Sequence, residues 1–349
     1  MAARFIPLRM TIPWILFAVL SAKCLHLDSN YSLPDEYIHD DTSRTEHRNL
    51  CVTFLSTPNQ EKKSDISRDT LLINIQYLDC DWLILFYRVD AVLQKQKLCA
   101  DAEAATIRFH HQNRIICCDE ASFVRNSSAY LANHIKNLTM LDVLGYRQYE
   151  QVRVVKPIMY IDVLYYLHFI RSYRRVFMMD SDIDFQKYDF KKGLLLWKNI
   201  STPPPLVVQP VMDGRTKIAS SRWNFWKNQK STERSNHIYP FIEQGHPFFD
   251  ARYFRWFVIT IIRDNTLPYH MAYQSDYGYD CIWCHAAYYF GTEVLNYIDY
   301  TTPCAVLIAA GYTIHRDTKT LKKSNIFRAL SGEVVKYYRQ CYPHWFRPF

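Results

Sequence analysis

The chain has 349 residues, enough for two or three domains or one large α/β unit, since a domain usually holds about 100 to 200 residues. Hydrophobic residues make up 49% and charged residues 22%, which is typical of a packed globular protein and excludes disorder over most of the length. Lys and Arg exceed Asp and Glu by 42 − 34 = +8, and the surplus is spread along the chain. This charge favours acidic small ligands over nucleic acid, for which a concentrated basic patch is typical.

Glycine is scarce and excludes two classes of nucleotide-binding protein. The sequence has 8 glycines, whereas an average usage of about 7% would give about 24. Each glycine stands alone, so neither a G-x-G-x-x-G turn nor a G-x-x-x-x-G-K phosphate loop is present. Rossmann-type dinucleotide enzymes and P-loop nucleotidases are therefore excluded.

Residues 1–22 have the layout of a secretory signal: Arg4 and Arg9 precede an apolar stretch that ends in small residues. The apolar run contains Pro13 and is short for a membrane helix, which needs about 20 such residues, so cleavage and retention as a signal anchor both fit. Sequons for N-glycosylation at Asn30, Asn126, Asn137 and Asn199 agree with a lumenal location. We expect a type II Golgi membrane protein, or a secreted one, that contacts the membrane only through this segment.

The sequence has ten cysteines, and in an oxidising lumen most of them should form disulfides, although their pairing cannot be read from the sequence. The motif Cys281-Ile-Trp-Cys284-His285 has the spacing of a haem attachment site or a redox site. No second C-x-x-C completes a zinc site, and no thioredoxin-like context surrounds the motif. We therefore favour structural disulfides here over a haem or redox function.

Strands and helices are expected to alternate along the chain. Residues 23–65 are polar and predict a luminal stem. Apolar runs predict strands at 81–87, 114–118, 176–179 and 206–210, and a late strand that leads from 304–310 to 312–315. Helices are expected at 156–173 and 251–264, and a domain transition near residue 215. This order predicts an α/β fold with a mostly parallel sheet flanked by helices.

An acidic turn follows the predicted strand at 176–179 and is the first candidate site. Asp180 and Asp182 stand at i and i+2, which suits a divalent cation that neutralises a diphosphate, and Mn²⁺ or Mg²⁺ prefers such oxygen ligands. A bare D-x-D also fits a solvated acidic turn. His315 follows the late apolar run and could supply a third ligand, although a single histidine is more often structural.

Several motifs together resemble known families. Val176-Phe-Met-Met-Asp-Ser-Asp-Ile183 resembles the D-x-D motif of GT-A glycosyltransferases. The C-terminal half resembles the uncharacterised 707 family of domains of unknown function, best known from plants. The matching pieces span about residues 145 to 322 and are Val208-Gln-Pro210, Glu243 before Pro247-Phe-Phe249, Arg255, Tyr277-Gly-Tyr-Asp280 and Tyr312-Thr-Ile-His315. The chain departs from that family with Ala309 in place of an acid and Tyr277 in place of a Trp.

The resemblance implies a GT-A-like enzyme that transfers a sugar from a nucleotide-sugar donor to a glycan or glycoconjugate acceptor. It implies a donor-binding half over 66–215 and an acceptor-binding, catalytic half over 216–349. In this interpretation Asp180 meets the ribose or the metal, Asp182 binds the metal, and His315 completes the metal shell.

Further residues take substrate-binding and catalytic roles in the same interpretation. Lys156 could contact the donor, although a surface lysine fits equally, and Gln209 is expected to bind substrate. Glu243 could bind acceptor hydroxyls or instead pair with Arg255. Asp280 is the candidate general base and Asp276 the alternative, while helix capping is the structural alternative for Asp280.

Two non-enzymatic alternatives stay open: a glycan-binding protein of the same fold, and a purely structural secreted domain. The 54 aromatic residues do not decide between these alternatives, because tyrosine and tryptophan rings both stack on sugars and fill cores. Trp223, Trp226 and Trp283 lie near the expected acceptor region, but most of the aromatic residues should be core.

Overall fold

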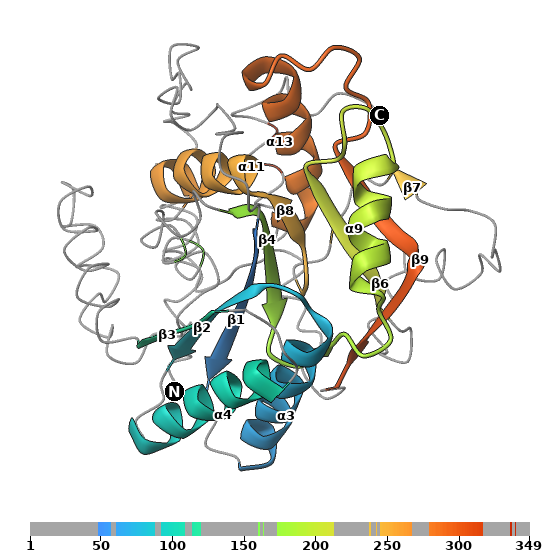
Figure 1. Ribbon diagram of the computed structural model, residues 1–349. Coiled ribbons are helices and arrows are strands. Elements are labelled where there is room, and N and C mark those ends of the chain that lie inside the picture. The colour runs from blue at the N-terminus through green and yellow to red at the C-terminus, as the bar shows by residue number, and fades with distance from the viewer. Residues whose placement is uncertain are drawn as a thin grey trace, which may run out of the picture.

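The computed structural model describes a mixed α/β fold built on one large sheet (Figure 1). Descriptions cover residues 48–56, 61–87, 92–108, 114–119, 173–212, 237–238, 245–266 and 279–316, with Tyr160, Val163, Ile242, Lys336 and Arg339. The strands are β1 (Arg48–Ser56), β2 (Asp81–Tyr87), β3 (Ile115–Asp119), β4 (Tyr173–Asp180), β5 (Ile183–Asp184), β6 (Val207–Met212), β7 (His237–Ile238), β8 (Phe248–Asp250) and β9 (Cys304–His315). The helices are α3 (Glu61–Tyr77), α4 (Val92–Arg108), α9 (Phe190–Asn199), α11 (Ala251–Trp256), η3 (Phe257–Thr266), η4 (Tyr279–Cys281), α13 (Trp283–Tyr289) and η5 (Phe290–Val294).

The sheet has the strand order β3-β2-β1-β4-β8-β6-β9-β5, and β7 pairs with β9. The first four strands in this order are parallel neighbours. The short β8 is antiparallel to both β4 and β6, so β4 and β6 point the same way, and β9 is parallel to β6. The carboxyl ends of β1, β2, β3, β4, β6 and β9 therefore lie at one edge of the sheet. The expected sheet with flanking helices is confirmed, with β5, β7 and β8 as its antiparallel members.

Helices cover both faces of the sheet because the strand residues alternate between two buried clusters. In β4, Val176 and Met178 belong to the cluster beneath α11, η3, α13 and η5, whereas Phe177 and Met179 belong to the cluster beneath α3 and α9. We call these faces the α11 side and the α3 side. Strands buried on both faces read as continuous apolar runs, which is why most of them could be predicted.

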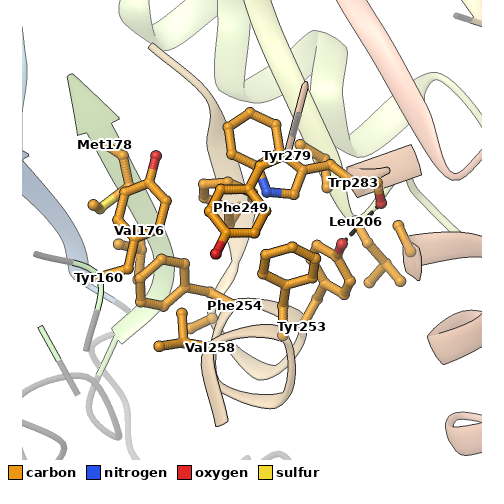
Figure 2. Close-up of a cluster of buried hydrophobic side chains, with 14 of the residues drawn as sticks. Tyr160, Val176, Met178, Leu206, Phe249, Tyr253, Phe254, Val258, Tyr279 and Trp283 are labelled. Carbon is orange, nitrogen blue, oxygen red and sulfur yellow. Dashed lines mark hydrogen bonds between the residues drawn. The ribbon is translucent and has the colours of Figure 1, made fainter. Parts of the chain in front are cut away.

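Aromatic rings fill much of the core on the α11 side (Figure 2). Phe249 of β8 meets the Trp283 ring of α13 edge to face, with centroids 5.3 Å apart. The Tyr253 hydroxyl donates a hydrogen bond of 2.8 Å to the Trp283 carbonyl. Trp283 is fully buried in this cluster, so it is a core residue and offers no ring face for sugar stacking.

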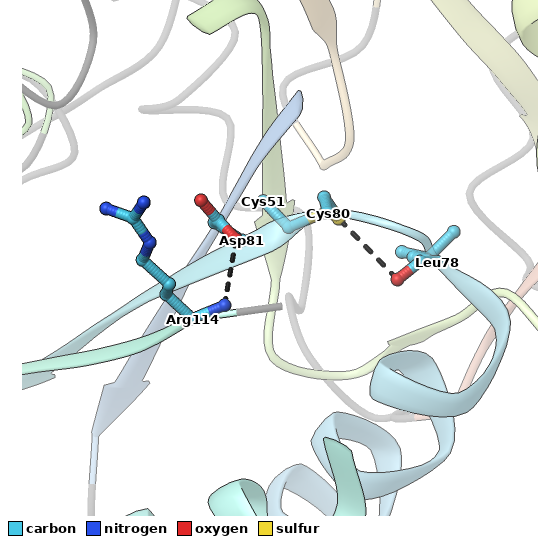
Figure 3. Close-up of a disulfide and its surroundings, with 5 residues drawn as sticks. All are labelled: Cys51, Leu78, Cys80, Asp81 and Arg114. Atoms are coloured by element: carbon cyan, nitrogen blue, oxygen red, sulfur yellow. Dashed lines mark hydrogen bonds between the residues drawn. A yellow bond between two sulfur atoms is a disulfide. The ribbon is translucent and has the colours of Figure 1, made fainter. Parts of the chain in front are cut away.

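Three disulfides join described residues: Cys51–Cys80, Cys99–Cys117 and Cys284–Cys304. Figure 3 shows the first, which links β1 to the residue before β2, close to the Asp81 carboxylate that accepts a hydrogen bond of 2.8 Å from the backbone of Arg114. Because Cys284 is bonded to Cys304, it is not paired with Cys281 and is not available for haem attachment. The expectation of structural disulfides at this motif is confirmed for Cys284, and the Cys281 side chain lies outside the described part of the structure.

Two expected boundaries need correction. The stem predicted over 23–65 contains β1, a central strand, and the start of α3, so the fold begins by Arg48. This strand was not predicted because the run over 50–55 contains Thr53 and lies between polar residues. The expected helix bound at 173 is wrong, because Tyr173 is the first residue of β4; Tyr160 and Val163 are helical, and the rest of 156–172 lies outside the described residues. The N-terminal segment 1–22 and the domain boundary near residue 215 lie outside the described residues.

Candidate metal site

The acidic turn lies at the carboxyl edge of the sheet, where parallel α/β sheets commonly bind ligands. Asp180 is the last residue of β4 and pairs with Phe54 near the end of β1. A Cβ added to Gly245 would lie 3.8 Å from Asp180 Oδ2 and 3.6 Å from Met212 Cε, so the ends of β4 and β6 meet at this glycine. The acids predicted from the sequence therefore stand where a ligand can approach.

His315, 133 residues after Asp182, joins the turn as expected. Its Nε2 lies 3.1 Å from Asp182 Oδ2, and the two side chains are 11% and 18% exposed. The contact arises because β9 extends past the sheet and its last residues pair antiparallel with β5, His315 opposite Ile183. At this distance the imidazole and the carboxylate form a hydrogen bond or ion pair, and both are groups that could bind a divalent cation.

This pair fits a cation that shares its shell with a substrate. Among the described residues, no three His, Cys, Asp or Glu side chains are grouped to hold a metal ion by themselves. Mg²⁺ commonly binds one or two carboxylates together with substrate phosphates and water, rather than a cage made of protein alone. Asp180, Asp182 and His315 therefore do not form the three-ligand group expected from the sequence, and metal binding by Asp182 and His315 together with a substrate stays a prediction.

A backbone frame holds the acidic turn against the rest of the site edge. The Asp180 amide donates to the Gly245 carbonyl at 2.8 Å, and the Met178 amide donates to the Pro247 carbonyl at 3.0 Å. From the α3 side, the Ser67 and Ser181 hydroxyl oxygens lie 3.0 Å apart. The turn is therefore fixed at its first two residues by partners from distant parts of the chain.

The segment after Asp182 is held by a buried amide that the sequence did not single out. Asn74 of α3 donates from Nδ2 to the Ile183 carbonyl at 2.7 Å, and its Oδ1 accepts from the Phe185 amide at 2.9 Å. Asn74 is 3% exposed, so these bonds replace water that the turn's backbone cannot reach. No local motif marks this contact, because 109 to 111 residues separate the partners.

His246 is a second buried polar residue that the sequence did not indicate. It is fully buried, and its Nε2 lies 3.2 Å from both the Pro210 carbonyl and the Thr313 hydroxyl. Gln209 Nε2 lies 3.5 Å from the same nitrogen, and Gln209 is 3% exposed. The described geometry thus gives Gln209 contacts within the core between β6 and β9, and its role in substrate binding stays a prediction.

The described contacts do not connect the other candidate residues to Asp182 and His315. Asp280 is half-buried in η4, next to Tyr279, which packs edge to face on Phe257 with centroids 5.8 Å apart. Lys156, Glu243 and Asp276 lie outside the described residues. The choice between Asp280 and Asp276 as the base stays a prediction, as does the pairing of Glu243 with Arg255.

Comparisons with known proteins give remote structural likenesses only. No known protein family and no curated protein matches the sequence, so the resemblance to the 707 family stays a prediction. Mouse xyloside xylosyltransferase 1, apo form, is similar over 65% of this chain and 74% of its own, with 9% identity and a TM-score of 0.34. Core-mannan synthase A from Aspergillus fumigatus, Mn/GDP form, is similar over 90% of this chain and 89% of its own, with 8% identity and a TM-score of 0.35. At these TM-scores the likenesses carry no argument about residue roles.

No described helix combines the length and apolar character needed to cross a bilayer.

Proposed function

We propose that this chain is a metal-dependent glycosyltransferase that moves a sugar from a nucleotide-sugar donor to a glycan or glycoconjugate acceptor in the secretory pathway. The observation that carries the proposal is the contact of His315 with Asp182, 3.1 Å apart at the edge where β4 and β9 end. The three described disulfides agree with an oxidising compartment. Two protein ligands beside a diphosphate would hold Mn²⁺ or Mg²⁺ as a shared site.

Asp182, His315 and Asp180 would have different roles in donor binding. Asp182 and His315 would hold the cation, which when bound neutralises charge on the diphosphate leaving group. Asp180 would accept hydrogen bonds from the ribose or add a ligand to the cation. The backbone frame keeps these groups in place, since Asp180 is bonded through its amide to Gly245 and Asp182 through its carbonyl to Arg316.

In the transfer, the acceptor hydroxyl oxygen bonds to the anomeric carbon as the bond between that carbon and the diphosphate oxygen breaks. The leaving nucleoside diphosphate takes the bonding electrons, and the hydroxyl proton passes to a carboxylate, for which Asp280 and Asp276 are the candidates. Lys156, Gln209 and Glu243 are the candidates for donor and acceptor contacts. The acceptor side of the proposal depends on residues that are mostly outside the described ranges.

The test is thermal stability of the purified full chain with Mn²⁺ and a panel of nucleoside diphosphates. A ligand that binds only the folded state raises the melting temperature, so one diphosphate should raise it in a Mn²⁺-dependent manner. Asp182→Asn should abolish this shift. Asp101→Asn is the matched control, because it removes a carboxylate from a partly exposed ion pair between Asp101 of α4 and Arg68 of α3, and Asp101 is not a proposed ligand. If no nucleotide shifts the folded wild-type protein, the donor site is wrong and a glycan-binding or structural role is favoured.

A further inference from the structure

Asp184, two residues beyond the proposed metal ligand Asp182, is a fully buried carboxylate with both oxygens engaged. Its Oδ1 accepts from the Gln186 amide at 2.7 Å. Its Oδ2 accepts from Arg316 Nε at 2.8 Å and also from Arg316 Nη2. Burying a charged carboxylate is costly unless it is paired and hydrogen-bonded, so this side chain depends on Arg316.

Arg316 also contacts the proposed site through its backbone. Its amide donates to the Asp182 carbonyl at 2.8 Å, and Arg316 directly follows the proposed ligand His315. One residue is therefore bonded to the main chain of one proposed ligand and adjacent in sequence to the other. The Arg316 side chain adds a second contact with the segment after Asp182, through its ion pair with Asp184.

The strand pairing at this point is too short to fix the geometry alone. Strand β5 has two residues, which pair with Ile314 and His315 at the end of β9. A two-residue pairing supplies few ladder hydrogen bonds, and among the described strands β5 is the last in the order on that side of β9. The ion pair between Arg316 and Asp184, 132 residues apart, is a further contact that holds the end of β9 against β5; we call this pair the clamp.

We propose that Arg316 is a positioning residue that sets the separation of Asp182 and His315 for metal binding, acting through Asp184. The proposal rests on the function proposed above, because it needs the metal at that pair. Residues that orient metal ligands from behind typically change metal affinity about 10- to 100-fold when they are altered. The Arg316 side chain is 35% exposed, so direct contact with donor phosphate is the alternative that the test distinguishes from a positioning role.

The experiment measures Mn²⁺ binding to the full chain by titration of the free-ion EPR signal, first without any nucleotide. Arg316→Lys keeps a positive charge for Asp184 but loses the planar fork, so the chain should fold while its Mn²⁺ affinity falls about tenfold or more. The double variant Asp184→Asn, Arg316→Gln removes both charges of the clamp and should show the same loss.

Arg252→Lys is the matched control. Arg252 forms a similar fork on Asp250, with Nε to Oδ1 at 3.1 Å and Nη2 to Oδ2 at 3.0 Å. This pair lies at the other end of β4, since Asp250 pairs with Arg175 near the start of that strand. Loss of its fork should leave Mn²⁺ affinity unchanged.

Each result bears on the proposal. Weaker Mn²⁺ binding in both Arg316 variants, with normal binding in Arg252→Lys, supports it. Wild-type affinity in Arg316→Lys, or an equal loss in Arg252→Lys, overturns it. A loss seen only when a nucleoside diphosphate is present also overturns it, because Arg316 would then contact phosphate directly. Failure of wild-type protein to bind Mn²⁺ both alone and with each nucleoside diphosphate tested, or binding that survives Asp182→Asn, refutes the proposed function itself and this inference with it.

Discussion

Replacement of Gly311, the glycine of β9, by alanine should strongly destabilise the fold. Its φ is +99°, and an added Cβ would lie 2.2 Å from the Lys187 carbonyl oxygen, a backbone atom that cannot rotate away. Left-handed backbone costs an L-residue about 1–2 kcal/mol, and forced overpacking about 1–3 kcal/mol. Gly311→Ala should therefore lower the free energy of unfolding by about 2–5 kcal/mol, a large part of a total of about 5–15 kcal/mol.

The effect should reach the metal site because Gly311 lies where β9 changes register. Pro210 of β6 pairs with Leu307, but its neighbour Val211 pairs with Tyr312, so residues 308–311 bulge out of the ladder. The bulge is anchored by Tyr188 opposite Gly311, and it redirects the end of the strand that carries His315. Urea unfolding measures the stability, and Mn²⁺ titration at low urea measures the local effect.

Gly245→Ala is the control for this prediction. Its Cβ would meet Met212, Asp180 and Ile183 at 3.6 to 3.9 Å, which is ordinary van der Waals contact, and its φ is not positive. An alanine that fits without strain is neutral or stabilises by about 0.4–1 kcal/mol through the unfolded chain. The reasoning fails if Gly311→Ala costs less than about 1 kcal/mol, or if Gly245→Ala costs as much.

Two further predictions concern buried polar groups. Asn74→Ala leaves one carbonyl and one amide of the segment after Asp182 without their partner, so the free energy of unfolding measured in urea should fall by about 2–4 kcal/mol. A fall below about 1 kcal/mol would contradict the dependence of this segment on the Asn74 side chain. Burial raises the pKa of Tyr253 and Tyr300 well above the usual value of 10, so above pH 10 the unfolded chain releases protons that the folded chain keeps. The free energy of unfolding should fall there by up to about 1.4 kcal/mol per pH unit for each tyrosine, and less steeply in Tyr253→Phe; a flat profile to pH 11 would refute this.

The sequence predicts the parts of the fold that local pattern encodes. The run Asp81–Tyr87 could be predicted as a strand because it is mostly apolar and buried on both faces. The late run that ends at His315 could be predicted as well, because the bulge within it does not interrupt its apolar pattern. Arg174 and Arg175 concealed the start of β4, since a basic pair seldom begins a central strand. Arg175 is accommodated there because its guanidinium carbon lies 5.0 Å from the centroid of a Trp197 ring.

The candidate site is predictable only in its ligand types. A D-x-D after a strand and a histidine after a later strand can be read from the sequence, because each is local to its own strand. The groups that hold them, Asn74 and Arg316, act on the turn across more than a hundred residues, and a polar side chain carries no local mark of such a partner. Long-range polar contacts of this kind are decided by topology, which brings α3 and the end of β9 to one edge of the sheet.

One disulfide joins two elements, α13 and β9, that the sequence pattern does not connect. Cys284 lies four residues after the candidate base Asp280, and Cys304 is the first residue of the strand that ends at His315. The bond therefore ties the helix beside a candidate base to the strand that carries a proposed metal ligand. The covalent link holds the helix after Asp280 against the amino end of β9 and so constrains the packing of α13 on the sheet. The cysteine that fitted the spacing of a haem attachment site is thus explained as one half of a structural disulfide.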